Sequence, residues 1–354
     1  MAQKKVDQTT PQPDGRFGDD AFTAFEKLND NADDAEARLK ALENGTGGIG
    51  DDVAALRQAD TALGQRIDAE QVARQAQVDA LGARLIGKNM LINCGLPINQ
   101  RVFAGGALAA GVYGYDRWKA GAGGCNVTIN AATGVFTHTS GPLQQIVEAP
   151  VLAWGQPLTI SVENPSGNIT VSVGGATGTI TSGAGRRGVT LTPSGSGNMT
   201  VQLTAAGVSY SRPQLERGSS ATAFDARPVA LELMLCQRYY ETSFEDGVVP
   251  SLGASSGLSM QSTGYTTGRV RLSFVPFKVR KRAAPAMTAF TDSLANPARA
   301  GGFAIYNASN YPSAAIAWVD VNQTSCGGFL DYGSGIAVGQ SYWTLGNWTA
   351  DAEL

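Results

Sequence analysis

The sequence lacks the features that usually mark membrane, secreted and zinc proteins. It contains no run of about 18 apolar residues, and its first twenty residues have no apolar core of the kind a signal peptide uses. We therefore expect neither membrane insertion nor Sec export. Histidine occurs once, as His138, so neither a histidine-based zinc set nor a Ser-His-Asp triad is indicated.

Cysteine is also scarce, and its spacing matches no known ligand pattern. Cys94, Cys125, Cys236 and Cys326 are scattered without a CxxC pair. This spacing suggests neither a metal site nor a disulfide framework. We expect buried free thiols in a protein made in a reducing cytosol, and we expect no metal and no cofactor.

Charge is low overall and is concentrated near the N-terminus. The chain has 27 Lys and Arg against 30 Asp and Glu, a net charge of −3. Residues 1–86 hold 10 of these basic and 16 of these acidic side chains, whereas most of the 44 glycines follow. A nucleic-acid partner is not expected, because it would require a basic stripe. The single basic cluster, Lys278, Arg280, Lys281 and Arg282, is expected to be a solvated loop or strand end.

Apolar residues in the first quarter of the chain recur at steps of three and four, the pattern of a coiled coil. One stretch begins at Phe25 and a second at Ile49, and the glycine-rich segment 44–48 between them is expected to act as a joint. The step of eleven from Ile67 to Val78 indicates a four-residue insertion that relaxes the supercoil. The predicted seam comprises Phe25, Leu28, Leu39, Leu42, Ile49, Val53, Leu56, Leu63, Ile67, Val78, Leu81 and Leu85.

The narrow stripe and its charged flanks favour an oligomeric coiled coil over a single amphipathic helix that lies on its own domain. Asp60 and Arg74 interrupt the stripe. We therefore expect the stem to depend on later domains for its oligomeric state.

After Gly87 the apolar period changes to two, which is typical of β-strands with one buried face. The pattern predicts two antiparallel β-sandwiches joined by a helical or extended connector, Val229–Tyr240. The predicted strands are Leu158–Val162, Ile169–Val173, Val189–Thr192 and Met199–Leu203, then Gly268–Phe274, Met287–Thr291, Gly302–Tyr306, Ala314–Asp320, Cys326–Tyr332 and Ser341–Trp348.

Four separated motifs occur in a distinctive order. They are KNMLIN at 88–93 with YDRW at 115–118, RPQLERG at 212–218 with ATAF at 221–224, ELMLCQRYY at 232–240, and VRLSFVPFKVRKR at 270–282. This order resembles phage tail-fibre and related receptor-binding proteins. The first two motifs are similar to the opening and the exit of a carbohydrate-binding-module-like jelly roll, and the last two to the continuation into a terminal domain.

The resemblance implies a homotrimeric tail fibre of the virion, assembled in the host cytoplasm. Its partners would be a tail or adaptor protein at one end and a host-surface glycan or protein at the other. The expected domains are an irregular virion-docking arm at 1–24, a short coiled coil and joint at 25–48, a trimeric coiled-coil stem at 49–87, the jelly roll at 88–228 and a terminal β-sandwich tip at 229–354.

Aromatic and amide side chains near the C-terminus are the positive signal for recognition. Sugars lay their C–H faces on aromatic rings, and binding surfaces are often anchored by Trp and Tyr. The candidate receptor-binding residues are Tyr306, Asn307, Asn310, Tyr311, Tyr332, Tyr342 and Trp343. By contrast, Trp118 is expected to pack against the jelly-roll sheet, and Asp116 and Arg117 are expected to pair with each other.

Catalysis is not expected. Polysaccharide cleavage commonly uses two carboxyl groups across a sugar bond, and the 14 acidic residues beyond position 88 form no recognisable active-site motif. Two alternatives to an attachment fibre are a head, neck or spacer fibre that binds no receptor, and a polysaccharide-depolymerising tailspike.

Overall fold

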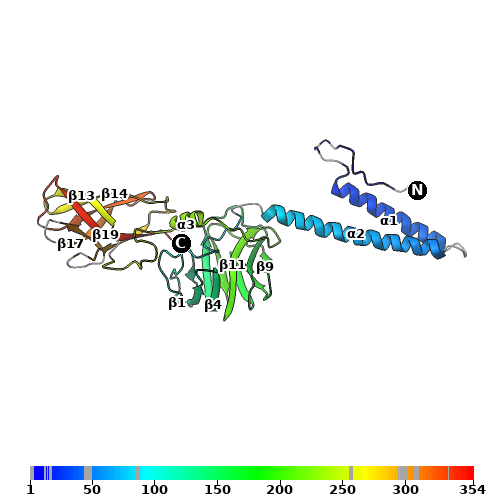
Figure 1. The fold of residues 1–354 in the computed structure, drawn as a ribbon, viewed down its shortest axis with the longest axis horizontal. Helices are drawn as coiled ribbons and strands as arrows, with labels where there is room; N and C mark the ends of the chain where they lie inside the picture. Colours follow the sequence, from blue (N-terminus) through cyan, green and yellow to red (C-terminus); the bar gives the residue numbers. More distant parts are fainter. Residues whose placement is uncertain are drawn as a thin grey trace. The chain divides into compact units, whose positions relative to one another are not determined.

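The computed structural model describes residues 4–11, 13, 15, 18–43, 50–83, 88–254, 258–293, 295, 301–306, 311–333 and 335–354. The chain divides into two compact units, Met1–Gly82 and Ala83–Leu354. Most secondary structure is β, with two helices before the first strand and one short helix between the two sets of strands (Figure 1). The predicted order along the chain, helices first and β domains after them, is confirmed.

The first unit contains two antiparallel helices, α1 (Ala21–Glu43) and α2 (Gly50–Ala83) (Figure 1). At one end of the pair, the Arg57 guanidinium bonds the Glu43 carboxylate. At the other end, the Arg74 guanidinium carbon lies 5.4 Å from the centre of the Phe25 ring. The two helices therefore form a hairpin within one chain. The predicted joint, residues 44–48, lies outside the described residues.

The predicted apolar stripe is the face that these helices bury. Val53, Leu56, Leu63 and Ile67 are half-buried on α2, whereas Asp60 in the same row is exposed. On α1, the stripe residues Phe25, Leu28 and Leu42 are half-buried and Leu39 is buried. The stripe thus has a partner in its own chain. Ile49 and Leu85, and the side chains of Val78 and Leu81, lie outside the described residues.

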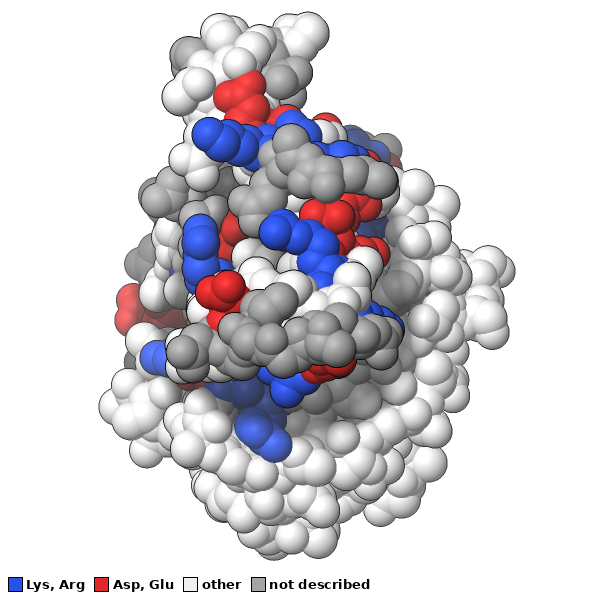
Figure 2. Space-filling model, turned by 90° about the vertical axis from the view of Figure 1, so that its right-hand side faces the viewer, with Lys and Arg blue, Asp and Glu red and all other residues white. Residues whose placement is uncertain are grey.

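Charged side chains are interspersed on the face shown in Figure 2, where basic and acidic groups of the described residues lie next to one another. Two pairs on the helices follow the i, i+4 rule, Glu36 with Lys40 at 3.5 Å and Glu70 with Arg74 at 2.7 Å. Exposed pairs of this kind contribute little to stability. The hairpin must therefore depend mainly on its apolar stripe.

The arm that precedes α1 packs back on that helix. The Lys4 ammonium contacts the Asp30 carboxylate at 2.5 Å, and the Lys27 ammonium contacts Asp19 at 2.6 Å. The described residues before Ala21 have no regular secondary structure beyond an isolated bridge, whereas residues 21–24 of the predicted irregular arm belong to α1. Side chains of the arm nevertheless have specific partners on α1.

The second unit begins with a sandwich of two antiparallel sheets, which keeps the name jelly roll below. One sheet has the order β1 (Gly106–Leu108), β3 (Cys125–Ile129), β4 (Val135–Ser140), β11 (Val208–Arg217), β6 (Leu158–Glu163) and β9 (Arg186–Leu191). The other has the order β2 (Lys119–Ala120), β5 (Pro142–Val147), β10 (Met199–Thr204), β7 (Ile169–Val173) and β8 (Ala176–Ile180). Alternate residues of both sheets form one core. The four strands predicted here correspond to β6, β7, β9 and β10.

The chain enters and leaves the jelly roll side by side. The Asn89 amide oxygen accepts from the Leu215 backbone N–H at 3.0 Å, and the Asn89 side-chain NH₂ donates to the Pro213 carbonyl at 3.2 Å. Arg227, just past the exit, donates to the Asn89 carbonyl. The KNMLIN and RPQLERG motifs therefore hold the two ends of the domain together.

The connector contains both a helix and an extended strand, the two forms predicted for it. Helix α3 spans Val229–Gln237, and β12 follows at Tyr240–Thr242. The helix is apolar on nearly all sides, so Val229 and Met234 remain 60% and 52% exposed although Cys236 is fully buried.

The terminal domain is a closed barrel, which corrects the sandwich predicted from the sequence. Strand β19 (Ser341–Asp351) pairs along its first half with both β13 (Leu258–Thr266) and β16 (Gly302–Tyr306). The sheet closes through β14 (Arg269–Pro276), β18 (Ser325–Asp331) and β17 (Ser313–Val319). The second half of β19 pairs with β12 and β15 (Ala286–Thr291). One long strand thus belongs to both parts of the domain.

Gly346 lies where β19 passes between these two sets of partners. A Cβ atom at this position would lie 2.3 Å from a Phe303 ring carbon, so a larger residue would displace that buried ring. The close approach requires glycine.

All four cysteines are buried and unpaired, as predicted. In the part of the chain that the structure describes, no helix has the length and apolar character needed to span a membrane.

Candidate functional site

The barrel carries an exposed row of side chains across three neighbouring strands, and two of these side chains are aromatic. Trp343 of β19 lies directly opposite Tyr306 of β16 and Gln261 of β13. Directly opposed residues share one face of a sheet, so the three side chains lie on the outer surface of the barrel. Trp343 is 56% exposed and Tyr306 is 39% exposed. We call Trp343, Tyr306 and Tyr311 the aromatic face.

Tyr311 extends this face beyond the end of β16. Its ring centre lies 5.2 Å from that of Tyr306, with an angle of 36° between the ring planes. Partly exposed rings that pack against each other can receive the apolar side of a ligand. The amide of Gln261 places a polar group at the edge of the same row. Together these side chains form a surface suited to a flat amphipathic ligand.

The structure describes five of the seven predicted receptor-binding residues and divides these five into two groups. It brings together Tyr306, Tyr311 and Trp343. Tyr342 alternates with Trp343 along β19 and packs with Tyr332 against the Val270 cluster inside the barrel. The Tyr332 hydroxyl donates to the Phe303 carbonyl at 3.1 Å, and the Tyr342 hydroxyl accepts from the Ala337 N–H at 2.8 Å.

Those positions give Tyr332 and Tyr342 packing contacts inside the barrel, apart from the aromatic face. An alternating strand has to turn adjacent aromatic residues to opposite faces. Burial also raises the pKa of the Tyr332 hydroxyl, as expected for an internal ring. Asn307 and Asn310 lie outside the described residues.

The YDRW motif joins the jelly roll to the barrel. Arg101 contacts Asp116 at 2.8 Å and Asp351 at 3.4 Å, and Arg117 bonds Glu353. Asp116 and Arg117 therefore pair with distant residues, which corrects the prediction that they pair with each other. A backbone turn at Arg117, with φ of 70°, directs the two neighbouring side chains to different partners.

Aromatic stacking strengthens this junction. The guanidinium carbon of Arg117 lies 3.5 Å from the centre of the Tyr239 ring, and that of Arg101 lies 3.7 Å from the Tyr240 ring. Trp118 is 1% exposed and packs in the jelly-roll core, as predicted. The motif thus attaches the barrel, and with it the aromatic face, to the jelly roll.

Replacing Asp116 by asparagine is expected to remove a pH-dependent contribution to stability. Burial raises the pKa of this carboxyl from 3.8 to about 6, and the Arg101 guanidinium offsets this only in part. The proton is therefore bound more tightly in the folded state. The resulting stabilisation is complete below about pH 4 and is lost as the pH rises through about 6.

The free energy of unfolding of wild type relative to Asp116→Asn should accordingly fall by about 2 to 3 kcal/mol between pH 4 and pH 7. Urea unfolding at a series of pH values measures this difference. Because other titrating groups are common to both proteins, a difference that does not vary with pH would contradict the assignment.

The basic cluster is mostly structural. Lys281 is fully buried and pairs with Glu241, whereas Arg282 donates to the Ala352 carbonyl at 2.6 Å. Arg280 bonds Gln323. The prediction of a simple solvated loop is therefore wrong for Lys281, because its ammonium reaches an acidic partner on β12.

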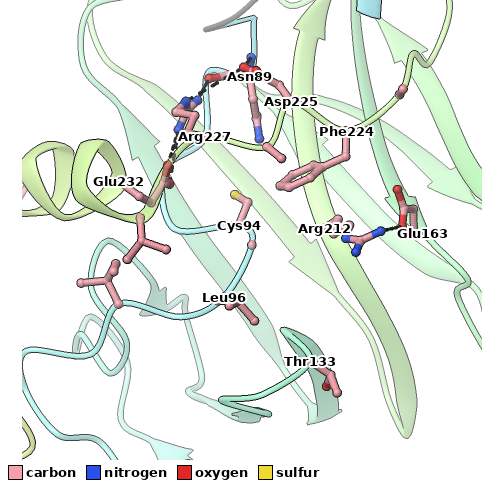
Figure 3. A pocket seen from close by; sticks show the side chains of 15 residues that line it. Asn89, Cys94, Leu96, Thr133, Glu163, Arg212, Phe224, Asp225, Arg227 and Glu232 are labelled. Carbon is pink, nitrogen blue, oxygen red and sulfur yellow. Dashed lines mark hydrogen bonds and ion pairs between the residues drawn. The ribbon is translucent and has the colours of Figure 1, made fainter.

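A cavity of about 520 Å³ lies in the jelly roll, beside the points where the chain enters and leaves it (Figure 3). Its lining includes Phe224, Arg212, Glu163, Leu96 and Thr133. None of these residues is among the sequence-based candidates for receptor binding.

No protein-family model matches this chain, and no curated protein matches it. Among solved structures, the chain is similar to a Paenibacillus sp. cycloisomaltooligosaccharide glucanotransferase complexed with cycloisomaltoheptaose. The identity is 11%, and the match covers 73% of this chain and 46% of that one, with a TM-score of 0.19. The match thus spans less than half of the enzyme, and a TM-score this low does not establish a shared fold.

The local sequence pattern does not predict which residues line the cavity. Phe224 belongs to the ATAF motif, which predicts only the exit of the domain, and Arg212 and Glu163 lie on different strands. Their one sequence signal is the Arg-Pro step at 212–213, because proline within a strand is typical of an edge or a bulge.

Proposed function

We propose that this protein is a virion structural protein, a trimeric tail fibre that attaches a phage to its host by non-covalent recognition of a surface glycan. Residues 1–24 would dock to a tail or adaptor protein, and the barrel would face the host. The observation that carries the proposal is the aromatic face, a group of neighbouring and partly exposed rings on a β domain that follows a helical segment. The four-motif resemblance supports the same function.

Attachment would depend on avidity. A single aromatic face offers a small contact area, so one site alone is expected to bind weakly. Three identical tips on one stem, and several fibres on one particle, raise the effective concentration of the second and later contacts. Weak single contacts are thereby converted into firm adsorption without any covalent step.

The trimeric stem in this proposal has to be reconciled with the helical hairpin. The stripe on α2 contacts α1, yet Val53, Leu56, Leu63 and Ile67 stay only half-buried. The apolar surface that remains accessible on these residues can contact further copies. We therefore assign the stripe two roles, pairing within the chain and association between hairpins.

The full chain is expected to form a trimer in solution. Light scattering should give three times the 36.7 kDa chain mass. Leu63→Asp, which introduces a charge into the stripe, should shift the mass toward the monomer. The control Gln65→Asp adds the same charge at an exposed position and should leave the trimer intact. A monodisperse wild-type monomer would overturn both the stem and the avidity mechanism.

Host attachment is tested by binding of the labelled full chain to a panel of bacterial strains, with release of reducing ends from their surface polysaccharide measured in parallel. Saturable binding without release is the expected result. Release of reducing ends would favour the depolymerising tailspike. A trimer that binds none of the strains would favour a spacer, head or neck fibre, which cryo-microscopy of the particle would place.

A further inference from the structure

The jelly-roll cavity has the construction of a ligand site, and it is separate from the aromatic face. Its walls come from the loop at Leu96, the turn at Thr133, the end of β6 at Glu163, the β11 residue Arg212 and the exit segment at Phe224 (Figure 3). The volume of about 520 Å³ is within the range of small-molecule sites in proteins.

A β-bulge directs Arg212 to this cavity. The pairing of β11 with β6 shifts register between Ser211 and Gln214, and Arg212 has a φ of 50°, a conformation that non-glycine residues seldom adopt. Bulges commonly re-aim a side chain beside a functional site. Here Nη1 of Arg212 donates to the Glu163 carboxylate at 2.7 Å, while the arginine side chain remains 53% exposed.

Phe224 supplies an aromatic wall close to two guanidinium groups. The guanidinium carbons of Arg186 and Arg212 lie 5.7 and 6.0 Å from the centre of its ring. Gly95 lies near the ring edge, where an added Cβ would be 3.7 Å from a Phe224 ring carbon. The ring is therefore held in place, and the glycine keeps space at its edge.

The lining carries Arg212 and Arg227 against Glu163, Asp225 and Glu232, and each of these groups is paired with an opposite charge. Glu163 pairs with Arg186 at 3.2 Å as well as with Arg212, and Arg227 pairs with Glu232 at 3.1 Å. A free phosphate or a carboxylate ligand would have to compete with these carboxylates for the guanidinium groups. A purely apolar ligand would leave the same charged groups desolvated and short of partners.

From this combination we propose that the cavity binds an uncharged sugar residue. A pyranose has C–H faces that can lie on Phe224, and its adjacent hydroxyl groups can both donate to Glu163 and accept from Arg212. This inference deepens the proposed function and rests on it for the source of the glycan. It adds a second recognition site, on the jelly roll, to the one on the barrel.

The probe is a set of neutral monosaccharides and disaccharides, with the corresponding uronic acids for comparison, titrated into the full wild-type chain by calorimetry. Phe224→Ala and Arg212→Ala should each weaken binding of a neutral sugar at least tenfold. Thr133→Trp places a bulky side chain at an exposed position on the rim and should block binding without removing a buried group. Arg187→Ala, an exposed arginine on β9 outside the lining, is the matched control and should bind normally.

Circular dichroism of each variant establishes that it is folded. The proposal is overturned if no neutral sugar binds, if only the uronic acids bind, or if Arg212→Ala and Thr133→Trp bind as wild type does. Failure here is distinguishable from failure of the proposed function. Bacterial binding that persists without cavity binding rejects the cavity alone, whereas sugar binding by a monomer that adsorbs to no bacterium rejects the fibre.

Discussion

Glu241→Ala is expected to lower the free energy of unfolding of the barrel by about 3 to 5 kcal/mol, because it leaves the Lys281 ammonium buried without its acidic partner. The two side chains are 1% and 0% exposed. The Glu241 carboxylate also accepts from the Lys278 N–H at 3.0 Å, so the loop at 278–281 would lose two contacts with β12. Burial already lowers the pKa of Lys281, and the loss of Glu241 would remove a group that raises it.

A double variant tests whether the lost stability comes from leaving the Lys281 ammonium buried without a partner. Glu241→Leu combined with Lys281→Met replaces both charged groups by apolar ones and should recover most of the lost stability. The matched control is Arg271→Ala, since Arg271 and Asp320 form an exposed pair 3.5 Å apart. That control should change the urea midpoint very little. A Glu241→Ala variant as stable as the control would show that the buried pair does not hold the barrel together.

Trp343→Ala is expected to weaken binding of the fibre to bacterial cells by roughly 30-fold or more. Removal of a central aromatic contact commonly costs about 2 kcal/mol, and avidity multiplies the loss when each trimer loses three such contacts. Trp343 is 56% exposed and lies outside the barrel core, so the variant should fold normally. The measurement is concentration-dependent binding of labelled trimer to a strain that wild type binds.

Tyr265→Ala is the matched control. Tyr265 is 52% exposed, and its ring centre lies 5.0 Å from that of Phe329, so its aromatic neighbour is not Trp343. The Tyr265→Ala variant should bind cells as wild type does. Equal loss in both variants would indicate a general effect of surface aromatic residues, and no loss in either would remove the aromatic face from the proposal. Tyr306→Ala should reproduce the Trp343 effect in part, because the two residues are cross-strand neighbours.

Much of the β structure could be predicted because it follows from local pattern. Alternation of apolar and polar residues identifies strands such as β7 and β10, whose buried residues form the jelly-roll core. Short strands with mixed faces, including β1 and β2, carry too few residues for a period to emerge. Strand β13 was also missed, since its run of serine, threonine and glutamine gives little hydrophobic contrast.

Closure of the barrel was not predictable by the same reasoning. It requires β19 to pair with β13, some 80 residues earlier, and with β16 on its other edge. Alternation of apolar and polar residues indicates only that a strand has two different faces. The partner on each edge is set by packing between residues far apart in the sequence, and Gly346 shows how close that packing becomes.

For the candidate site, the sequence indicates that aromatic residues form it, but it does not indicate which of them face solvent. Tyr306 and Trp343 form the exposed row, whereas Tyr342, next to Trp343 in the chain, turns inward. Which of two adjacent aromatic residues faces solvent depends on which side of the strand faces the barrel interior. That choice is made by the closed sheet as a whole.

Local pattern alone established the apolar stripe of the helices, the strand-rich body and the burial of the four cysteines, because these depend on periods and side-chain chemistry within short segments. Long-range packing decided that α1 covers the stripe of α2, that Lys281 is buried rather than solvated, and that Arg212, Glu163 and Phe224 converge on one cavity. Those outcomes join residues that lie from about a dozen to about sixty positions apart, and contacts of that range are selected by the whole fold rather than by neighbouring residues.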